Sequence, residues 1–144
     1  LGALMAEIQG WEGIVPVSGW RSQNEQKRIY FDSLRENGEA FTRAFVALPG
    51  HSEHQTGLAL DIVDASYQIL DQGQEDTLVQ QWLIEHSWEY GFIWRYPGDK
   101  TDLTGTAEEV WHYRYVGKEA AKEIYEQGVC LEEYLEQKKE ENGQ

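Results

Sequence analysis

Cysteine, positive charge and long apolar runs are scarce in this chain of 144 residues. Its single cysteine, Cys130, excludes an intramolecular disulfide and a zinc cage built of thiolates, so any metal must be held by histidine and carboxylate side chains. Lysine and arginine number 12 against 26 aspartates and glutamates, and the net charge of −14 repels phosphate groups. We therefore expect no binding of nucleic acid and no membrane contact by this domain itself. No apolar run approaches the roughly 20 residues that span a bilayer.

Apolar and aromatic residues, by contrast, are plentiful. Hydrophobic residues make up 40% of the chain and aromatic residues 12%, which is enough to form a core and excludes a disordered chain. The length fits one domain over residues 1–144. The chain begins at Leu1 rather than at a methionine, inside a helical pattern that ends near Gly10, so we expect that a natural N-terminal segment is missing. That segment would carry a signal peptide, a membrane anchor or nothing special.

Hydrophobic periodicity and capping signals divide the rest of the chain into strands and helices. A capping pattern at residues 22–25 predicts a helix that ends at Gly38, followed by a further helical turn or two over residues 39–47. The pattern predicts strands at 14–18, 57–63, 92–94 and 110–116, helices at 77–88, 119–127 and 131–139, a loop at 96–107 and a frayed tail over about 137–144. Leu78 is among the expected core residues. Together these elements predict an α+β domain with a small, mostly antiparallel sheet packed against helices.

One histidine precedes the strand expected at residues 57–63. The alternation of this strand places Ile62 and its leucine neighbours on one face and Asp61 on the other. Gly57 lets the chain turn back, so the His54 imidazole can approach the Asp61 carboxylate. Spacing alone leaves two interpretations open, because a histidine near an aspartate is more often a hydrogen-bonded pair or a cap than a set of metal ligands.

A second histidine, His112, lies early in the strand expected at residues 110–116, and Glu109 precedes it by three residues. His54, Asp61 and His112 together would offer two nitrogens and one oxygen. Such a set leaves the fourth position of a tetrahedral zinc site open, which distinguishes a catalytic zinc from a structural one. Glu109 would then be the free carboxylate that acts as the base of a metallohydrolase.

The two histidine segments together resemble a known family. Ser-x-His-x-x-Gly-x-Ala-x-Asp followed by Glu-x-Trp-His is similar to the motifs of the zinc D-Ala-D-Ala peptidases of the VanY and VanXY type, which are relatives of the VanX dipeptidase. The matching residues are Ser52, His54, Gly57, Ala59, Asp61, Glu109, Trp111 and His112. Residues 18–22, Ser-Gly-Trp-Arg-Ser, are also similar, and the resemblance covers roughly residues 14–135. It implies a peptidase domain with a zinc cleft on the sheet.

The resemblance implies a role for each residue of the site. His54, Asp61 and His112 would bind one Zn²⁺ ion. Glu109 would take a proton from water and deliver it to the leaving amine. Arg21 would face the carbonyl oxygen as it becomes an oxyanion, a task that suits a planar and permanently charged guanidinium.

The resemblance also implies a substrate. Ser52 and Gln26 would bind the free C-terminal carboxylate of peptidoglycan precursors that end in D-Ala-D-Ala. The implied activity is that of a D,D-carboxypeptidase that removes the terminal D-Ala, in cell-wall metabolism or glycopeptide resistance. Three related activities stay open: a D-Ala-D-Ala dipeptidase, a bifunctional VanXY-like enzyme and an L,D-carboxypeptidase that acts on tetrapeptides. We expect a bacterial monomer that is extracytoplasmic, or cytoplasmic if it is VanXY-like.

Two interpretations from other classes use the same residues. The hedgehog signalling domain shares this metal-site architecture as a module without catalysis, but a purely structural zinc needs neither Glu109 nor Arg21. A non-haem iron oxygenase also uses two histidines and one carboxylate. In that class the first histidine and the acid are usually separated by one residue, whereas six residues separate His54 from Asp61.

Overall fold

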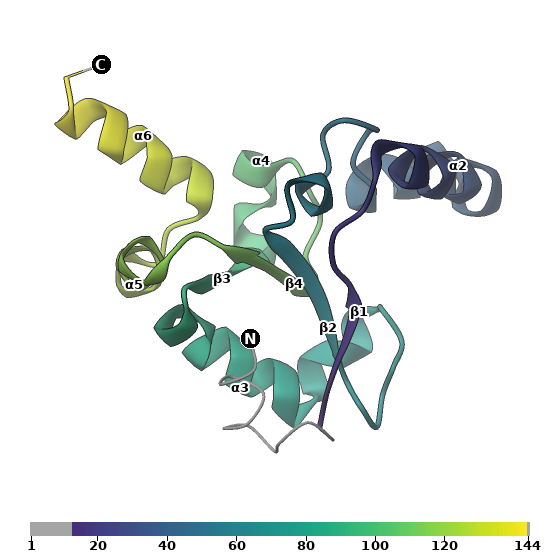
Figure 1. The fold of residues 1–144 in the computed structure, drawn as a ribbon, viewed down its shortest axis with the longest axis horizontal. Coiled ribbons are helices and arrows are strands. Elements are labelled where there is room, and N and C mark those ends of the chain that lie inside the picture. Colours follow the sequence, from purple (N-terminus) through teal and green to yellow (C-terminus); the bar gives the residue numbers. More distant parts are fainter. Residues whose placement is uncertain (1–12, 144) are drawn as a thin grey trace.

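A four-stranded sheet forms the centre of the fold (Figure 1). The computed structural model describes residues 13–143, and the helix expected before Gly10 lies outside them. The strands are β1 (Ile14–Ser18), β2 (Ala59–Asp64), β3 (Phe92–Tyr96) and β4 (Glu109–Tyr115), in the order β1-β2-β4-β3. Every neighbouring pair is antiparallel, which confirms the predicted antiparallel sheet. Pro16 lies in the edge strand β1, where a residue without an N–H is tolerated.

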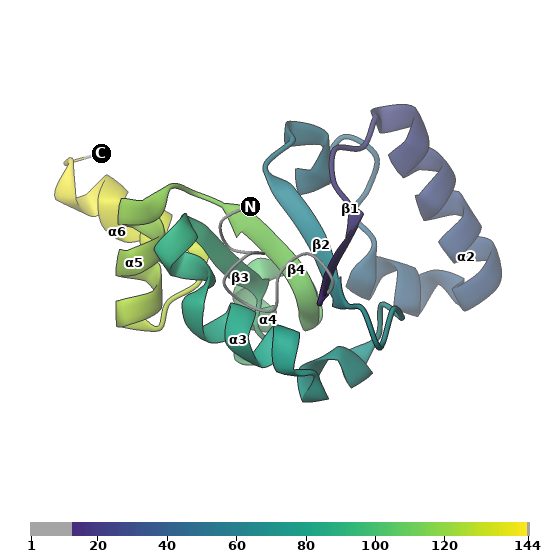
Figure 2. The same ribbon diagram turned by 60° about the horizontal axis from the view of Figure 1, so that its bottom comes forward.

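Helices surround this sheet. They are α2 (Gln23–Phe45), α3 (Leu78–His86), α4 (Thr101–Thr104), α5 (Lys118–Gln127) and α6 (Leu131–Glu141). In both ribbon views α2 lies at one end of the molecule and α5 and α6 lie at the other (Figures 1 and 2), while α3 packs against β2 and β3. The short helix α4 lies inside the segment that the sequence predicts as a loop, and α6 continues through most of the expected frayed tail. None of the helices within residues 13–143 is long and apolar enough to cross a membrane.

Helix α2 consists of two helical arms joined at Gly38. This residue has φ 82° and ψ 174°, a conformation outside the helix that glycine adopts without steric cost. The hydroxyl groups of Ser33 on the first arm and Thr42 on the second are 2.8 Å apart and hydrogen-bonded, so the break has a fixed geometry. The predicted helix end at Gly38 is confirmed. The second arm carries Phe41 and Phe45, which line the cleft described below.

The two faces of the sheet differ in what they carry. The main core cluster consists of Ile14, Ile62, Val79, Leu83 and Tyr113. Because side chains alternate along a strand, Asp61 next to Ile62 and His112 next to Tyr113 point to the opposite face. That second face is therefore free to carry polar groups, and it is the face on which the candidate site lies.

The prediction of Leu78 as a core residue is wrong. Its side chain is 68% exposed at the start of α3, whereas the neighbouring Val79 and Leu83 are fully buried. The Thr77 side chain caps this helix by accepting a hydrogen bond from the Gln80 N–H, and this cap fixes where the first turn begins. Periodicity predicts the spacing of the buried residues, but the cap and the packing set which residues of the first turn face the core.

Candidate active site

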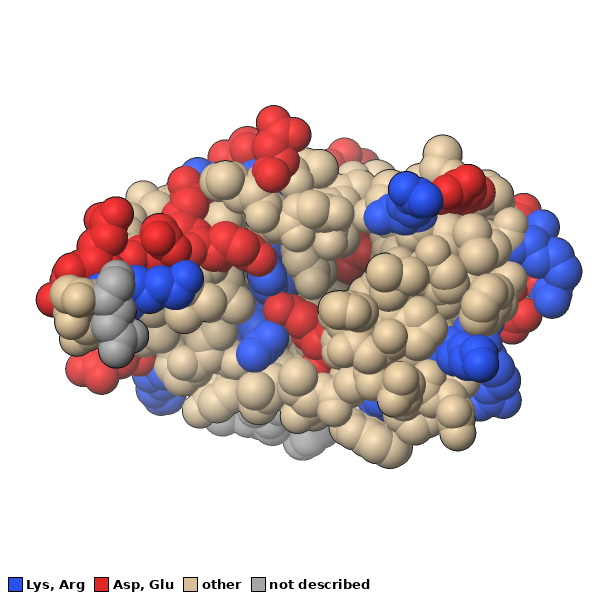
Figure 3. All heavy atoms as spheres, turned by 90° about the horizontal axis from the view of Figure 1, so that it is seen from above, with Lys and Arg blue, Asp and Glu red and all other residues tan. Residues whose placement is uncertain are grey.

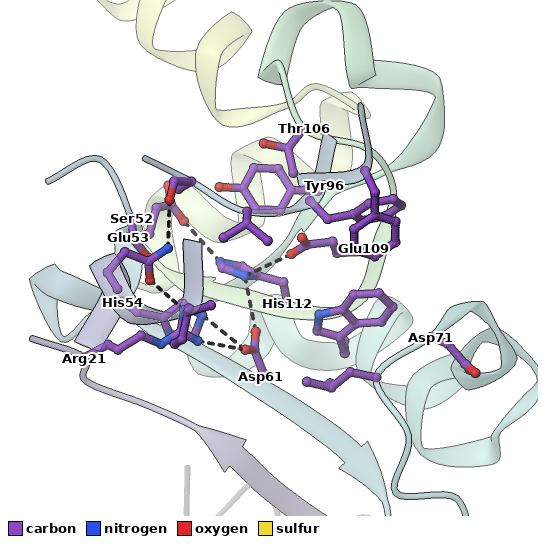
Figure 4. A pocket seen from close by; sticks show the side chains of 18 of the residues that line it. Arg21, Ser52, Glu53, His54, Asp61, Asp71, Tyr96, Thr106, Glu109 and His112 are labelled. Carbon is purple, nitrogen blue, oxygen red and sulfur yellow. Dashed lines mark hydrogen bonds and ion pairs between the residues drawn. The ribbon is translucent and has the colours of Figure 1, made fainter. Parts of the chain in front are cut away.

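Three of the predicted residues meet on the polar face of the sheet. Asp61 of β2 and His112 of β4 are direct cross-strand partners, and His54 lies in the 3₁₀ turn Glu53–Thr56 shortly before β2. His54 Nε2 is 3.2 Å from Asp61 Oδ2, and His112 Nδ1 is 3.2 Å from Asp61 Oδ1 (Figure 4). The three side chains offer ligand atoms that all lie within 4.8 Å of one another. We refer to these three residues as the trio.

The trio fits a zinc ion in its spacing and in its unsatisfied atoms. A tetrahedral zinc with bonds of about 2.0–2.1 Å has ligand–ligand edges of about 3.3 Å. Both separations given above are close to this value. Asp61 Oδ1 is buried and has no hydrogen-bond partner within residues 13–143, a costly state for a polar atom. Burial alone would raise the pKa of Asp61, but His112 and His54 hold it well below its usual range, so the carboxylate is charged and suited to a cation.

Each imidazole of the trio directs one particular nitrogen inward. His54 Nδ1 is 2.8 Å from the carbonyl oxygen of Gly19, which can only accept a hydrogen bond. Nδ1 therefore carries the proton, and Nε2 is free for a metal. His112 has the opposite orientation: its Nε2 is 3.4 Å from Glu53 Oε2, and its Nδ1 faces Asp61.

Glu109 lies directly beside the trio. Its Oε2 is 3.3 Å from His112 Nδ1, and its side chain is buried (Figure 4). Burial raises the pKa of Glu109, and the nearby His112 offsets part of this rise. A carboxylate with a raised pKa takes up a proton more readily near neutral pH, which a general base must do. The position thus suits the predicted role.

Arg21 is held at the edge of the trio by polar neighbours. Its guanidinium donates to Gln26 Oε1 at 2.8 Å and to Ser18 Oγ at 2.7 Å, and it lies 3.6 Å from Asp61 Oδ2. Gln26 in turn donates its side-chain amide to the carbonyl oxygen of Ala47 at 2.8 Å. Both ends of the Gln26 amide are thus engaged within the chain. These contacts place Gln26 where it positions Arg21, and its predicted contact with a substrate stays a prediction.

The trio lines a cleft of about 370 Å³. Phe41 and Phe45 of α2 also line it, so part of its wall is apolar. Asp71 lies on the rim, yet its carboxylate accepts hydrogen bonds from the Tyr67 hydroxyl and from the Gly73 N–H. Figure 4 shows this carboxylate far from the trio and turned away from it. These local hydrogen bonds therefore hold the Asp71 carboxylate away from the trio.

The negative charge of the chain is unevenly distributed over its surface. Figure 3 shows acidic side chains gathered over the C-terminal helices at the left, while much of the remaining face is uncharged. At the α2 end of this face, acidic side chains lie beside lysine and arginine side chains, so the charge there is more nearly balanced. An acidic protein can in this way still admit a peptide that ends in a carboxylate.

Two cleft residues have hydroxyl groups that are free to bind a ligand. Ser52 and Tyr96 both line the cleft, and neither hydroxyl forms a hydrogen bond with another residue in the range 13–143. The Tyr96 ring lies 4.8 Å from the His112 ring, and Figure 4 shows its hydroxyl on the side of Ser52. Burial raises the pKa of Tyr96, so its hydroxyl keeps its proton and can donate it. The sequence motifs assign no role to Tyr96, nor to Glu53, although Glu53 stands between the motif residues Ser52 and His54.

Comparison with known proteins gives the same picture as the geometry. A family model described as VanY, D-alanyl-D-alanine carboxypeptidase, matches residues 5–118. A D-alanyl-D-alanine carboxypeptidase from Enterococcus faecalis is 45% identical over 139 residues, which cover 89% of this chain and 50% of that protein. The chain thus spans about half the length of this relative.

Solved structures with this fold include enzymes of several related activities. The vancomycin resistance D,D-dipeptidase VanXYg, in complex with a D-Ala-D-Ala phosphinate analogue, superposes with a TM-score of 0.85 and 43% identity over 93% of this chain and 54% of that chain. The LdcB LD-carboxypeptidase superposes with a TM-score of 0.80 and 42% identity, over 93% of this chain and 62% of that chain. A mutant of a vancomycin resistance D,D-pentapeptidase VanY, in complex with Zn(II), superposes with a TM-score of 0.77 and 42% identity. The match covers 92% of this chain and 75% of that chain.

Proposed function

Since this chain belongs to the VanY family of D-alanyl-D-alanine carboxypeptidases, we propose that it removes the terminal D-Ala from peptidoglycan precursors ending in D-Ala-D-Ala. The observation that carries this proposal is the buried trio with Glu109 beside it in a cleft. Two imidazoles and one carboxylate are the ligands of a zinc site that keeps a position open for reaction. We propose that the trio holds one zinc ion, as a VanY structure of the same fold holds Zn(II).

Each residue beside the trio has a separate role in peptide hydrolysis. Zinc, when bound, supplies a Lewis acid that polarises the scissile carbonyl. Glu109 accepts the proton of the attacking water and then passes it to the nitrogen of the leaving D-Ala. Arg21, held by Gln26 and Ser18, keeps a permanent positive charge beside the carbonyl oxygen while negative charge develops there.

The terminal carboxylate of the substrate needs donors in a chain whose net charge is −14. Ser52 and Tyr96 offer two hydroxyls in the cleft that no residue of the described range 13–143 engages. Hydrogen bonds to a charged acceptor are stronger than those between neutral groups. We propose that both hydroxyls donate to this carboxylate. Gln26 is the third predicted donor, and it would have to give up its bond to Ala47 in order to serve.

The identity of the acidic residues near the cleft bears on the length of the substrate. A dipeptidase must recognise the free amino group of its short substrate, for which a carboxylate is the natural partner. Asp71 is the acidic residue of segment 65–76 that lines the cleft, and its oxygens are already bonded to Tyr67 and Gly73. The orientation of this carboxylate away from the trio favours a longer peptide over the free dipeptide. The TM-score of 0.85 with the D,D-dipeptidase VanXYg makes dipeptidase activity, alone or in a bifunctional enzyme, the second candidate. The similarity to the LdcB LD-carboxypeptidase keeps L,D-carboxypeptidase activity as a third.

The domain boundaries, compartment and oligomeric state are predictions that accompany this proposal. We expect residues 1–144 to act as one catalytic domain and as a monomer. The bacterial enzyme would work outside the cytoplasm, or inside it if the activity is VanXY-like. Size-exclusion chromatography with light scattering and cell fractionation would test these expectations.

Release of D-Ala from a peptidoglycan pentapeptide tests the proposed function. Zinc-loaded protein and its Glu109→Gln variant would be compared, with the free D-Ala-D-Ala dipeptide and the tetrapeptide assayed in parallel. We expect zinc-dependent release from the pentapeptide that the variant loses. Absence of release from all three substrates despite stoichiometric bound zinc would refute the proposal and favour a zinc module without catalysis.

A further inference from the structure

A chain of ion pairs leads from His112 of the trio to the C-terminal helix α6. Glu53 Oε2 lies 3.4 Å from His112 Nε2, on the side of the ring that faces away from Asp61. The other oxygen of Glu53, Oε1, accepts a hydrogen bond from Arg95 Nε at 2.8 Å and forms an ion pair with Arg114 Nη1 at 2.8 Å. Glu53 therefore connects a metal-ligand candidate to two arginines from β3 and β4.

The two atoms that face each other, one on Glu53 and one on His112, lack other polar partners within residues 13–143. Glu53 Oε2 and His112 Nε2 are both buried, and within residues 13–143 neither has a hydrogen-bond partner; each faces the other at 3.4 Å as an ion pair. An ionised carboxylate can only accept, so closing this contact into a hydrogen bond requires the imidazole proton on Nε2 and leaves the lone pair of Nδ1 directed at the trio. The Gly19 carbonyl oxygen has the same effect on His54 from the other side.

The far end of the chain of ion pairs is rigid. Arg95 is buried, and its Nη1 and Nη2 atoms bind the two carboxylate oxygens of Glu132 at 3.0 and 2.5 Å. A guanidinium that binds a carboxylate through two parallel bonds has little freedom to rotate. Glu132 lies in the first turn of α6, beyond the residues that the family model matches.

We propose that Glu53 is a positioning residue for His112, and that Arg95 and Glu132 hold Glu53 in place. Helix α6 thereby becomes part of the support of the metal centre. The carboxylates of Glu53 and Glu132 balance the charges of Arg95 and Arg114, which makes their burial tolerable. Charge balance alone does not explain why the second oxygen of Glu53 faces His112. The inference rests on the proposed zinc site.

Zinc affinity, measured by competition with a chromophoric chelator, tests this inference. Glu53→Gln is expected to weaken zinc binding by about 10- to 100-fold, because an amide is a weaker acceptor for the imidazole N–H. Glu132→Gln is expected to weaken it by roughly 2- to 10-fold through Arg95. Glu136→Gln is the matched control, because Glu136 lies on the same helix and, among residues 13–143, pairs only with the exposed Lys139. This control should bind zinc as the parent does.

Two further measurements separate positioning from a purely structural role. If Glu132 acts through Glu53, the double variant binds zinc as weakly as Glu53→Gln alone, whereas independent losses would multiply and overturn the proposed connection. In proton NMR spectra, the His112 Nε2–H resonance should shift upfield in Glu53→Gln and stay in place in the control. Should Glu53→Gln fail to fold, Glu132→Gln and its control still decide the connection to α6.

The outcomes distinguish this inference from the proposed function. Failure of the parent protein to bind zinc would remove the proposed site itself. Tight zinc binding by the parent, together with unchanged affinity and an unchanged His112 resonance in Glu53→Gln, would leave the proposed function intact and refute the positioning role.

Discussion

Replacing Tyr96 by phenylalanine should impair catalysis and leave the fold intact. The aromatic ring, which packs 4.8 Å from the His112 ring and 4.7 Å from the Arg95 guanidinium, is retained in this variant. The hydroxyl makes no hydrogen bond inside the part of the chain that the structure describes, so its removal breaks none there. We therefore expect the free energy of unfolding to change by less than about 0.5 kcal/mol.

The cost of the Tyr96→Phe substitution should fall on substrate binding. A hydrogen bond to a charged carboxylate contributes about 1.5–3 kcal/mol, which corresponds to a loss of roughly 10- to 150-fold in kcat/KM. Because the carboxylate is bound equally in the ground state and in the transition state, most of this loss should appear in KM.

Steady-state release of D-Ala from the pentapeptide, together with thermal unfolding, measures both expectations. Tyr125→Phe is the control, since Tyr125 is an exposed tyrosine on α5 that does not line the cleft. An unchanged kcat/KM in Tyr96→Phe, with Ser52→Ala impaired, would show that the Tyr96 hydroxyl does not bind the substrate. A large fall in stability would show that the hydroxyl has a structural partner.

Three more predictions follow from the site. Glu109→Gln should reduce kcat by about 10²- to 10⁴-fold with zinc stoichiometry unchanged, as measured by metal analysis and D-Ala release; loss of zinc from this variant would make Glu109 a ligand instead. Arg21→Lys should lower kcat by roughly 10²- to 10³-fold, because lysine cannot keep the paired bonds to Gln26 and Ser18, and an unchanged kcat would exclude oxyanion contact. Removal of zinc by chelation should lower the melting temperature by roughly 5–10 °C relative to protein in a hundredfold excess of zinc over its Kd, and calorimetry after zinc is restored should recover the loss. An identical melting temperature with and without zinc would mean that the trio does not bind the ion in the folded state.

Local sequence patterns predicted much of this molecule because they depend on neighbours along the chain. The strand around Asp61 was predictable from the alternation that buries Ile62, and the break at Gly38 from a glycine at a helix end. The family motif identified the three members of the trio, yet neither alternation nor spacing shows that Asp61 and His112 are cross-strand partners. Strand pairing depends on the whole chain, because residues 61 and 112 meet only when β2 and β4 are in register.

The remaining residues could not be predicted because their roles depend on side chains from distant elements. Glu53 stands inside the motif, but its role follows from Arg95 on β3 and from Glu132 on α6. Gln26 was predicted to bind substrate, and only the structure shows that its amide bonds Arg21. Tyr96 was predicted to begin a loop, whereas it ends β3 beside His112.

The order of the strands along the sequence determines when each member of the trio is synthesised. His54 and Asp61 leave the ribosome almost together, but His112 follows only after β3 has been made, and Glu132 comes later still. A metal ion can therefore meet two of the three members of the trio at most until β4 has been made, and all three are held in place when β4 lies between β2 and β3. Because β4 is a central strand, closing the sheet and completing the site are one event. An unfinished chain can hold a cation only loosely, and a complete hydrolytic centre exists only in a molecule whose sheet has closed.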